Sequence, residues 1–284
     1  MLAHAGFHPY AHRTMCNRMH LTDAVGSGPL SRPVLALTFD HMGRARDVGR
    51  GEVNRPDPAS ADLAVGFPRL LGLLDELGLT ATFFVEGWNG LHHPDRIEQL
   101  LARGHEVGLH GWVHERWLDL AIGQRERILV DGLAALRRLG VAEPGFRAPG
   151  GYVGRDTLPL LADLGFGYDS SLLDADDDPD GRPRVVAGGL VNVPFRWAWV
   201  DYWQCVLHPD DPATAATLIE RWDDELATAA ATGAPMTVDA HPFFVAVDDD
   251  RWRAFSGWLH KLATDGIRFT TAGRLSAEAG TAPC

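Results

Sequence analysis

Polar side chains follow five short apolar runs of this sequence, and their types suit acid–base and metal chemistry. The first run, "LALTFDHMG" at Leu35–Gly43, leads from apolar residues directly into an acid and a histidine. In a fold of parallel strands, the carboxyl ends of the strands share one rim, and active sites are built there. The candidate site residues at the five run ends are Asp40 with His41, His110, Arg147, Asp169 and His241.

The motif "HGWVH" places His110 and His114 four residues apart. On a helical turn, residues at this spacing lie on one face, so both imidazoles can reach one ion. Neutral imidazole is a common zinc ligand, and catalytic zinc has three protein ligands and one open position. The spacing alone is a weak signal in a chain with 13 histidines, so its weight depends on the other motifs.

Two further motifs can handle charge and protons. In "FRAPGGY", Arg147 lies in a turn rich in proline and glycine, where its guanidinium can orient a carboxylate or polarise a carbonyl. In "TVDAHPF", His241 ends an apolar run directly before Pro242. An imidazole titrates near neutral pH, so His241 can donate a proton to a leaving group.

The segments around these residues alternate between strand and helix patterns. Short apolar or β-branched runs predict strands at Pro33–Phe39, Thr80–Gly87 and His105–Gly111. Helical spacing, ending at a glycine each time, predicts helices at Ala61–Gly78, His93–Gly104, Gln124–Gly140, Asp156–Gly165 and Pro212–Gly233. Such alternation predicts an α/β fold with a mainly parallel sheet. About six to eight such units fit a complete or distorted (β/α) barrel.

Composition limits the class of protein. The chain has 284 residues, 45% of them hydrophobic and 23% charged, as in an ordinary globular protein. We expect an N-terminal arm over residues 1–31 and one domain over residues 32–284. The formal charge of −12 argues against a nucleic-acid partner, and the lack of an 18-residue apolar run argues against a membrane span.

The cysteines and the N-terminus bear on localisation. Cys16, Cys205 and Cys284 are far apart and form no CxxC pair, so neither a disulfide framework nor a zinc knuckle is expected. The first residues lack the basic flank and continuous apolar stretch of a signal peptide. We therefore expect a cytoplasmic protein.

Taken in order, the motifs resemble those of the polysaccharide deacetylase superfamily, the carbohydrate esterase 4 or NodB-homology group. The resemblance runs from about Val34 to Thr271 and includes "TFDHMG", "HGWVH", "FRAPGGY", "GYDSSL" and "DAHPF". The stretch "NVPFRWAWVDYW" at Asn192–Trp203 is similar to a segment of the branch with peptidoglycan-deacetylase-like and allantoinase-like members. The resemblance implies a distorted (β/α) barrel of the NodB type that hydrolyses C–N amide bonds.

The resemblance also implies a role for each motif residue. A divalent ion, with Zn²⁺ as the first choice, would lie on His110 and His114 and polarise the amide carbonyl and a bound water. Asp40 would be the general base, and His241 would protonate the leaving nitrogen. The positioning of the base and the neighbouring histidine falls to Arg147 and Asp169.

His41 departs from the family pattern, which has a second aspartate as the third metal ligand at this position. Either His41 coordinates the ion and completes a three-histidine site, or it points into the substrate pocket and leaves metal binding to other residues. Residues assigned to substrate binding are Trp88, Trp112, Trp197 and Asp201, the tryptophans because their rings can stack on a sugar or a flat heterocycle.

The leading hypothesis is a metal-dependent N-deacetylase acting on a small, soluble N-acylated metabolite or amino sugar. The absence of an export signal favours such a substrate over a cell-wall polymer. The alternatives are a ring-opening amidase acting on a cyclic ureide or imide, a deformylase acting on a formamido sugar, and a non-catalytic binding module. A monomer and a homo-oligomer both remain open.

Overall fold

A computed structural model describes residues 32–280 of the chain. The expected N-terminal arm, residues 1–31, lies outside the described residues, so that prediction stays a prediction. Within residues 32–280, no helix is both long enough and apolar enough to cross a membrane.

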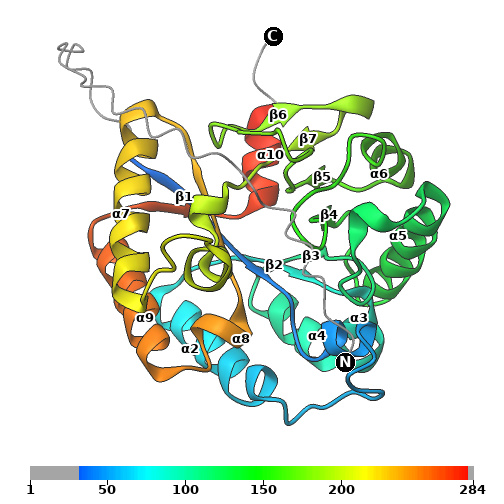
Figure 1. Ribbon diagram of the computed structural model, residues 1–284, viewed down its shortest axis with the longest axis horizontal. Coiled ribbons are helices and arrows are strands. Elements are labelled where there is room, and N and C mark those ends of the chain that lie inside the picture. The colour runs from blue at the N-terminus through cyan, green and yellow to red at the C-terminus, as the bar shows by residue number, and fades with distance from the viewer. Residues whose placement is uncertain (1–31, 281–284) are drawn as a thin grey trace, which may run out of the picture. The chain divides into compact units, whose positions relative to one another are not determined.

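A nine-stranded sheet forms the centre of the described domain, with the strand order β6-β7-β5-β4-β3-β2-β1-β8 and with β9 also pairing with β1 (Figure 1). All pairs are parallel except β6 with β7, which form the only antiparallel pair of this sheet. The strands are β1 Val34–Asp40, β2 Thr82–Val85, β3 Glu106–Leu109, β4 Gly145–Phe146, β5 Tyr168–Asp169, β6 Arg184–Val185, β7 Val191–Asn192, β8 Met236–Ala240 and β9 Arg268–Thr270. The predicted α/β fold with a mainly parallel sheet is thereby confirmed.

The sheet is curled but does not close into a barrel by strand pairing. Its two end strands, β6 and β8, do not pair with each other. Four strands, β4 to β7, are only two residues long. The expected barrel is therefore observed as an open, curled α/β sheet.

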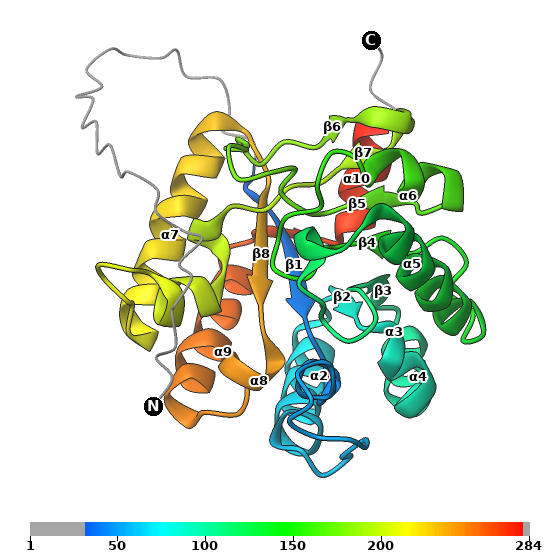
Figure 2. The same ribbon diagram turned by 45° about the vertical axis from the view of Figure 1, so that its right-hand side comes forward.

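Most of the helices lie outside the curl of the sheet, and the last one lies inside it (Figure 2). The helices are α1 Ala45–Gly49, α2 Phe67–Leu77, α3 Gly87–His92, α4 Pro94–Ala102, α5 Ile122–Arg137, α6 Leu158–Leu164, α7 Ala215–Thr232, α8 Pro242–Val245, α9 Asp249–Thr264 and α10 Ala272–Gly280. Short 3-10 or π turns occur at Asp62–Gly66, Trp117–Asp119, Ala187–Gly189, Trp197–Trp199 and Trp203–Leu207. Helices α2, α6 and α7 end at Gly78, Gly165 and Gly233, which adopt the left-handed conformation that glycine tolerates best.

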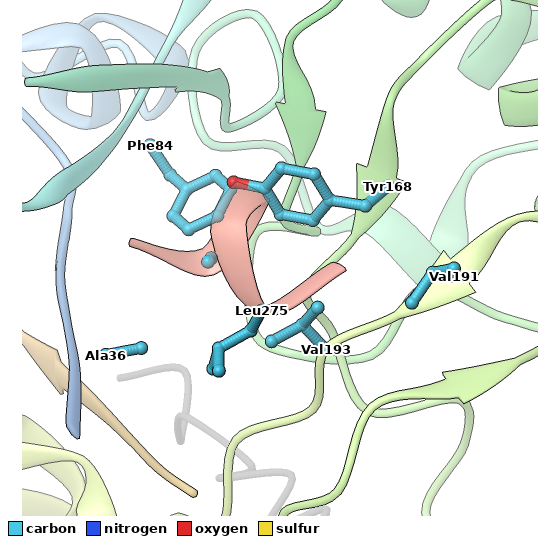
Figure 3. Packing of buried hydrophobic residues seen from close by; sticks show 7 residues of the cluster. Ala36, Phe84, Tyr168, Val191, Val193 and Leu275 are labelled. Carbon is cyan, nitrogen blue, oxygen red and sulfur yellow. The ribbon is translucent and has the colours of Figure 1, made fainter. Parts of the chain in front are cut away.

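Helix α10 fills the inside of the curl. Its residues Ala272 and Leu275 are buried in one apolar cluster. The cluster also takes in residues of four strands and the segment after β7, namely Ala36, Phe84, Tyr168, Val191 and Val193 (Figure 3). Burial of a large aliphatic side chain such as that of Leu275 contributes about 2 kcal/mol. This apolar filling leaves the carboxyl ends of the strands as the place for polar groups.

The register of β1 brings two of the candidate residues to the same level. Phe39 of β1 pairs with Ala240 of β8, so the residues that follow them, Asp40 and His241, leave neighbouring strands side by side. On the other edge of β1, Asp40 pairs with Phe84 of β2. The strand ends therefore meet at one rim, as the sequence predicts.

Candidate active site

Asp40 is held by a fully buried arginine. The Arg147 Nη1 donates hydrogen bonds to Asp40 Oδ1 (2.9 Å) and Thr38 Oγ1 (2.8 Å). Its remaining nitrogens donate to the carbonyl and the hydroxyl of Ser170 (2.9 and 2.8 Å), and the guanidinium lies 4.3 Å from the ring centre of Phe84. With its donors directed in this way, Arg147 fixes the orientation of the Asp40 carboxylate and supplies its counter-charge.

A second carboxylate shares the same guanidinium. Asp239 of β8 is buried, and its Oδ1 lies 3.3 Å from Arg147 Nη1. Burial, followed by the charge of Asp40, raises the pKa of Asp239 to about 8. One arginine between two buried acids favours a state in which Asp239 carries a proton near neutral pH. Sequence reasoning missed Asp239, although it stands only two residues before His241.

His241 is paired with Asp201. Its Nδ1 lies 2.6 Å from Asp201 Oδ1, and its backbone N–H donates to Asp201 Oδ2 at 2.8 Å. Burial alone would lower the pKa of His241, but the carboxylates of Asp201 and Asp239 outweigh it and raise that pKa to about 9. His241 is therefore protonated at neutral pH and able to donate.

This pairing differs from the expected role of Asp201. The residue was predicted to bind substrate, yet it is fully buried and both carboxylate oxygens are bonded to His241. Its carboxylate orients the imidazole and stabilises the charged form of His241. That function had been expected of Asp169.

Asp169 lies behind the site. It accepts hydrogen bonds from the backbone and hydroxyl of Ser171 (3.1 and 2.8 Å) and from Asn192 Nδ2 (2.6 Å). Ser171 Oγ in turn accepts from the backbone N–H of Ala148, next to Arg147 (2.9 Å). Burial raises the pKa of Asp169 to about 6. Asp169 therefore contacts the site indirectly, through Ser171 and the peptide group that joins Arg147 to Ala148. None of its hydrogen bonds described here goes to Asp40 or His241.

Three imidazoles gather on the other side of Asp40. The ring centres of His110 and His114 are 5.1 Å apart, and those of His41 and His114 are 5.6 Å apart. His110 Nδ1 lies 2.9 Å from the Arg147 carbonyl, so it must carry the proton. Its Nε2 is then left free, 3.8 Å from Asp40 Oδ2. Burial lowers the pKa of His110 and of His114, which keeps both rings neutral, as metal binding requires.

The "HGWVH" segment is a turn and not the helical turn expected from its spacing. Gly111 adopts φ +70°, and the Glu115 carboxylate accepts the backbone N–H groups of Trp112 and Val113, both at 3.0 Å. His114 then takes φ 61°, which returns its ring toward His110. The two histidines still meet, but through a strained loop.

His41 is held by a residue that sequence reasoning missed. The fully buried carboxylate of Glu86 pairs with His41 Nδ1 and accepts hydrogen bonds from the Met42 backbone (3.2 Å) and Asn89 Nδ2 (2.8 Å). Burial would raise the pKa of Glu86, but the neighbouring His41 lowers it on balance. The signal was present, because Glu86 directly follows the run "TATFFV", as the other site residues follow theirs.

The three histidines offer a donor set that suits a divalent metal. Carboxylate or carbonyl partners at Nδ1 of His41 and His110 leave the Nε2 atoms as ligands, a common arrangement around zinc. Among residues 32–280, no three His, Cys, Asp or Glu side chains are gathered closely enough to hold an ion as they stand. The chemistry of the three imidazoles fits a metal, although the rings are not close enough together in this structure to hold one.

The predicted substrate-binding tryptophans lie in different surroundings. Trp88 is buried on α3, and the centre of its ring lies 4.2 Å from that of His92. Its backbone N–H donates to the backbone carbonyl of Trp112, which is half-buried. Trp197 is also half-buried; its Nε1 donates to the hydroxyl of Tyr152 at 3.0 Å. The role of the three tryptophans in substrate binding stays a prediction.

The rings that do contact the histidines are phenylalanine and tyrosine. Phe243 has its ring centre 5.4 Å from that of His241 and 5.5 Å from that of His41. Tyr202 lies 5.9 Å from His241 by the same measure. Sequence reasoning did not single out either aromatic residue.

Comparison with known proteins identifies relatives of the chain. The model of the family described as polysaccharide deacetylase matches residues 27–168, half of the sequence. A peptidoglycan deacetylase of Helicobacter pylori is 33% identical over 156 residues, 54% of this chain and 50% of the relative. A peptidoglycan-N-acetylglucosamine deacetylase of Bacillus cereus is 28% identical over 165 residues, 58% of this chain and 67% of the relative. The chain spans about half the length of the first curated relatives it matches.

Solved structures share the fold over most of the chain. A Mycobacterium smegmatis protein described as a polysaccharide deacetylase superposes with a TM-score of 0.72 at 29% identity, covering 91% of this chain and 94% of its own. The allantoinase Puue has a TM-score of 0.70 at 18% identity, covering 88% and 91%. At that identity the likeness to the allantoinase concerns the fold alone.

Proposed function

Since this chain belongs to the polysaccharide deacetylase family, we propose that it hydrolyses an amide C–N bond and releases the acyl group of an N-acylated amino sugar or a similar small N-acylated metabolite. One observation carries the proposal. Asp40, paired with Arg147, and the charged His241, paired with Asp201, leave adjacent parallel strands side by side. A base and an acid in this arrangement suit the two proton transfers of amide hydrolysis.

The chain's own residues account for the proton movements. Asp40 accepts a proton from the attacking water, and Arg147 keeps that carboxylate oriented and charge-balanced. When the amide bond breaks, His241 gives its proton to the leaving nitrogen, which departs as an amine. Asp201 holds the imidazole with Nε2 free for this donation. The acyl group leaves as a carboxylic acid.

We further propose that His41, His110 and His114 hold a divalent ion, with Zn²⁺ as the first choice. The Nδ1 partners of His41 and His110, Glu86 and the Arg147 carbonyl, support this assignment. A bound metal would supply Lewis-acid stabilisation of the amide carbonyl and would lower the pKa of the attacking water.

Acetate release by purified, Zn²⁺-supplemented protein tests the proposal, with N-acetylglucosamine and its short β-linked oligomers as substrates. We expect turnover by the unchanged chain and a loss of about 10²- to 10⁴-fold in the Asp40→Asn variant. Glu98→Gln, which removes an exposed carboxylate on α4, is the matched control and should not change the rate. Full activity in Asp40→Asn would refute the assignment of the base, and ring opening of a cyclic ureide without acetate release would replace the deacetylase proposal.

A further inference from the structure

One cation at the site has no carboxylate partner among residues 32–280. The charged groups described above form pairs, namely Asp40 with Arg147, His241 with Asp201 and His41 with Glu86. Arg46 forms no ion pair within residues 32–280, and its Nε is buried without a hydrogen-bond partner. No other arginine of this part of the chain leaves a buried guanidinium nitrogen unsatisfied. The nearby carboxylate of Asp47 is already engaged by Arg44.

Arg46 faces the centre of the site. Its guanidinium carbon lies 5.1 Å from the ring centre of Phe243, the ring that contacts both His41 and His241. It is also close enough to His114 to act on that ring electrostatically. The unpaired cation therefore stacks on the ring that contacts the proposed acid, and it lies near His114, one of the proposed metal-binding histidines.

Tight packing fixes this position. Arg46 belongs to the short helix α1, which lies against the turn that carries His114. A Cβ atom at Gly49 of α1 would come within 2.4 Å of the Val113 carbonyl, so only glycine permits so close an approach. The backbone position of Arg46 is thus fixed by the packing of α1 against the turn that carries His114.

A guanidinium whose Nε is buried without a hydrogen-bond partner, and whose charge no carboxylate balances, is unfavourable where water is partly excluded. Stacking on Phe243 offsets part of this cost. The remaining donors are suited to a carboxylate or a phosphate, which the planar guanidinium binds through two parallel hydrogen bonds.

We infer that Arg46 recognises an anionic group, a carboxylate or a phosphate, on the natural substrate. The inference rests on the proposed function and narrows its substrate class to N-acylated compounds that carry a negative charge near the amide. Such a substrate would complete the charge pairing of the site when it binds. Arg46 would then determine specificity, while the proton transfers stay with Asp40 and His241.

Matched pairs of compounds test this inference. The phosphate arm compares N-acetylglucosamine with its 6-phosphate, and the carboxylate arm compares N-acetylglucosamine with N-acetylmuramic acid. We expect the Zn²⁺-loaded protein to favour the anionic member of at least one pair in kcat/KM by about 10- to 100-fold, mainly through KM. The arm that shows the preference identifies the anion.

Substitution of the arginine should remove the preference. In Arg46→Gln the preference should disappear, so that the anionic and the neutral compound give the same kcat/KM. Arg46→Lys should restore part of the preference, because it keeps the charge but loses the two-pronged geometry. Arg50→Gln, the same charge change at an exposed position next to α1, should leave the preference intact.

Calorimetric binding of the same compounds separates this inference from the proposed function. Tighter binding of the anionic member by the unchanged chain, lost in Arg46→Gln, would support the role of Arg46 even if no acetate were released. Absence of acetate release from every compound would count against the deacetylase proposal alone. Equal binding of both members in both pairs, including no measurable binding of either, would overturn the inference.

Discussion

The two halves of the candidate site are built in different ways. On the acid–base half, Asp40 is paired directly with Arg147 and His241 with Asp201, and Asp40 and His241 come at the ends of neighbouring strands. On the histidine half, the proposed metal-binding residues lie in loops, and His41 and His114 adopt positive φ angles of 67° and 61°. No other non-glycine residue of the described chain has a positive φ.

The two halves therefore differ in the interactions that stabilise them. Ion pairs between strand ends are part of the folded sheet, so the acid–base half is complete as soon as the chain folds. A left-handed backbone costs about 1–2 kcal/mol at each histidine, and the imidazoles gain no mutual attraction in return. The histidine half should therefore depend on a bound ion for its stability, whereas the acid–base half should depend on its internal pairs.

Removal of Arg147 is the strongest way to break the acid–base half. In Arg147→Met, the buried carboxylates of Asp40 and Asp239 lose their shared counter-charge, so the free energy of unfolding should fall by about 3–5 kcal/mol. Urea denaturation at neutral pH measures the change. Arg268→Met, which breaks an exposed pair with Glu278, is the control and should cost about 0.5 kcal/mol or less. A loss below 1 kcal/mol for Arg147→Met would show that the fold does not depend on this pairing.

The histidine half should respond instead in its affinity for metal. Glu86→Gln removes the charge that holds His41 Nδ1, and we expect Zn²⁺ affinity to fall about 10- to 100-fold. Competition with a chromophoric chelator measures the affinity without any need for turnover. Glu98→Gln again serves as the control, and Glu86→Asp should restore part of the affinity. Unchanged affinity in Glu86→Gln would favour the alternative in which His41 points into the substrate pocket.

The acid–base half should also show itself in the pH profile. The pKa of His241 is raised to about 9 against the effect of burial, mainly by Asp201, so kcat/KM should fall as pH rises through about 9 and the histidine loses its proton. In Asp201→Asn that pKa drops, and the alkaline fall should begin at a lower pH, with about a tenfold loss at pH 8. Tyr202→Phe, beside the same imidazole, should leave the profile in place. A profile that does not shift in Asp201→Asn would exclude His241 as the donor.

The sequence predicts the acid–base half better than the histidine half, for physical reasons. Alternating strand and helix patterns indicate parallel strands, and parallel strands bring Asp40, Arg147 and His241 to one rim. A curled sheet was expected, but its open edge was not, because strands of two residues such as β4 and β5 show no periodicity from which their pairing could be predicted.

The sequence also does not predict which side chains pair with each other in space. Glu86 and Asp239 were not predicted as site residues, because the role of each depends on the side chain that it contacts, His41 for Glu86 and Arg147 for Asp239. The "HGWVH" turn was predicted as helical, since spacing alone does not reveal that Gly111 and Glu115 bend it otherwise.

The titration of Asp239 tests whether the two acids truly share Arg147. Asp239 titrates near 3.8 when unfolded and at about 8 in the folded chain, so between these values the folded chain binds more protons. The free energy of unfolding should therefore fall through this group as pH rises from about 4 to about 8. Asp239→Asn cannot ionise and should lose that fall, so its free energy of unfolding relative to that of the unchanged chain should be higher at pH 8 than at pH 5. If urea denaturation at pH 5 and pH 8 gives the same difference for both chains, Asp239 is ionised throughout, and Arg147 stabilises two full charges rather than one charge and one proton.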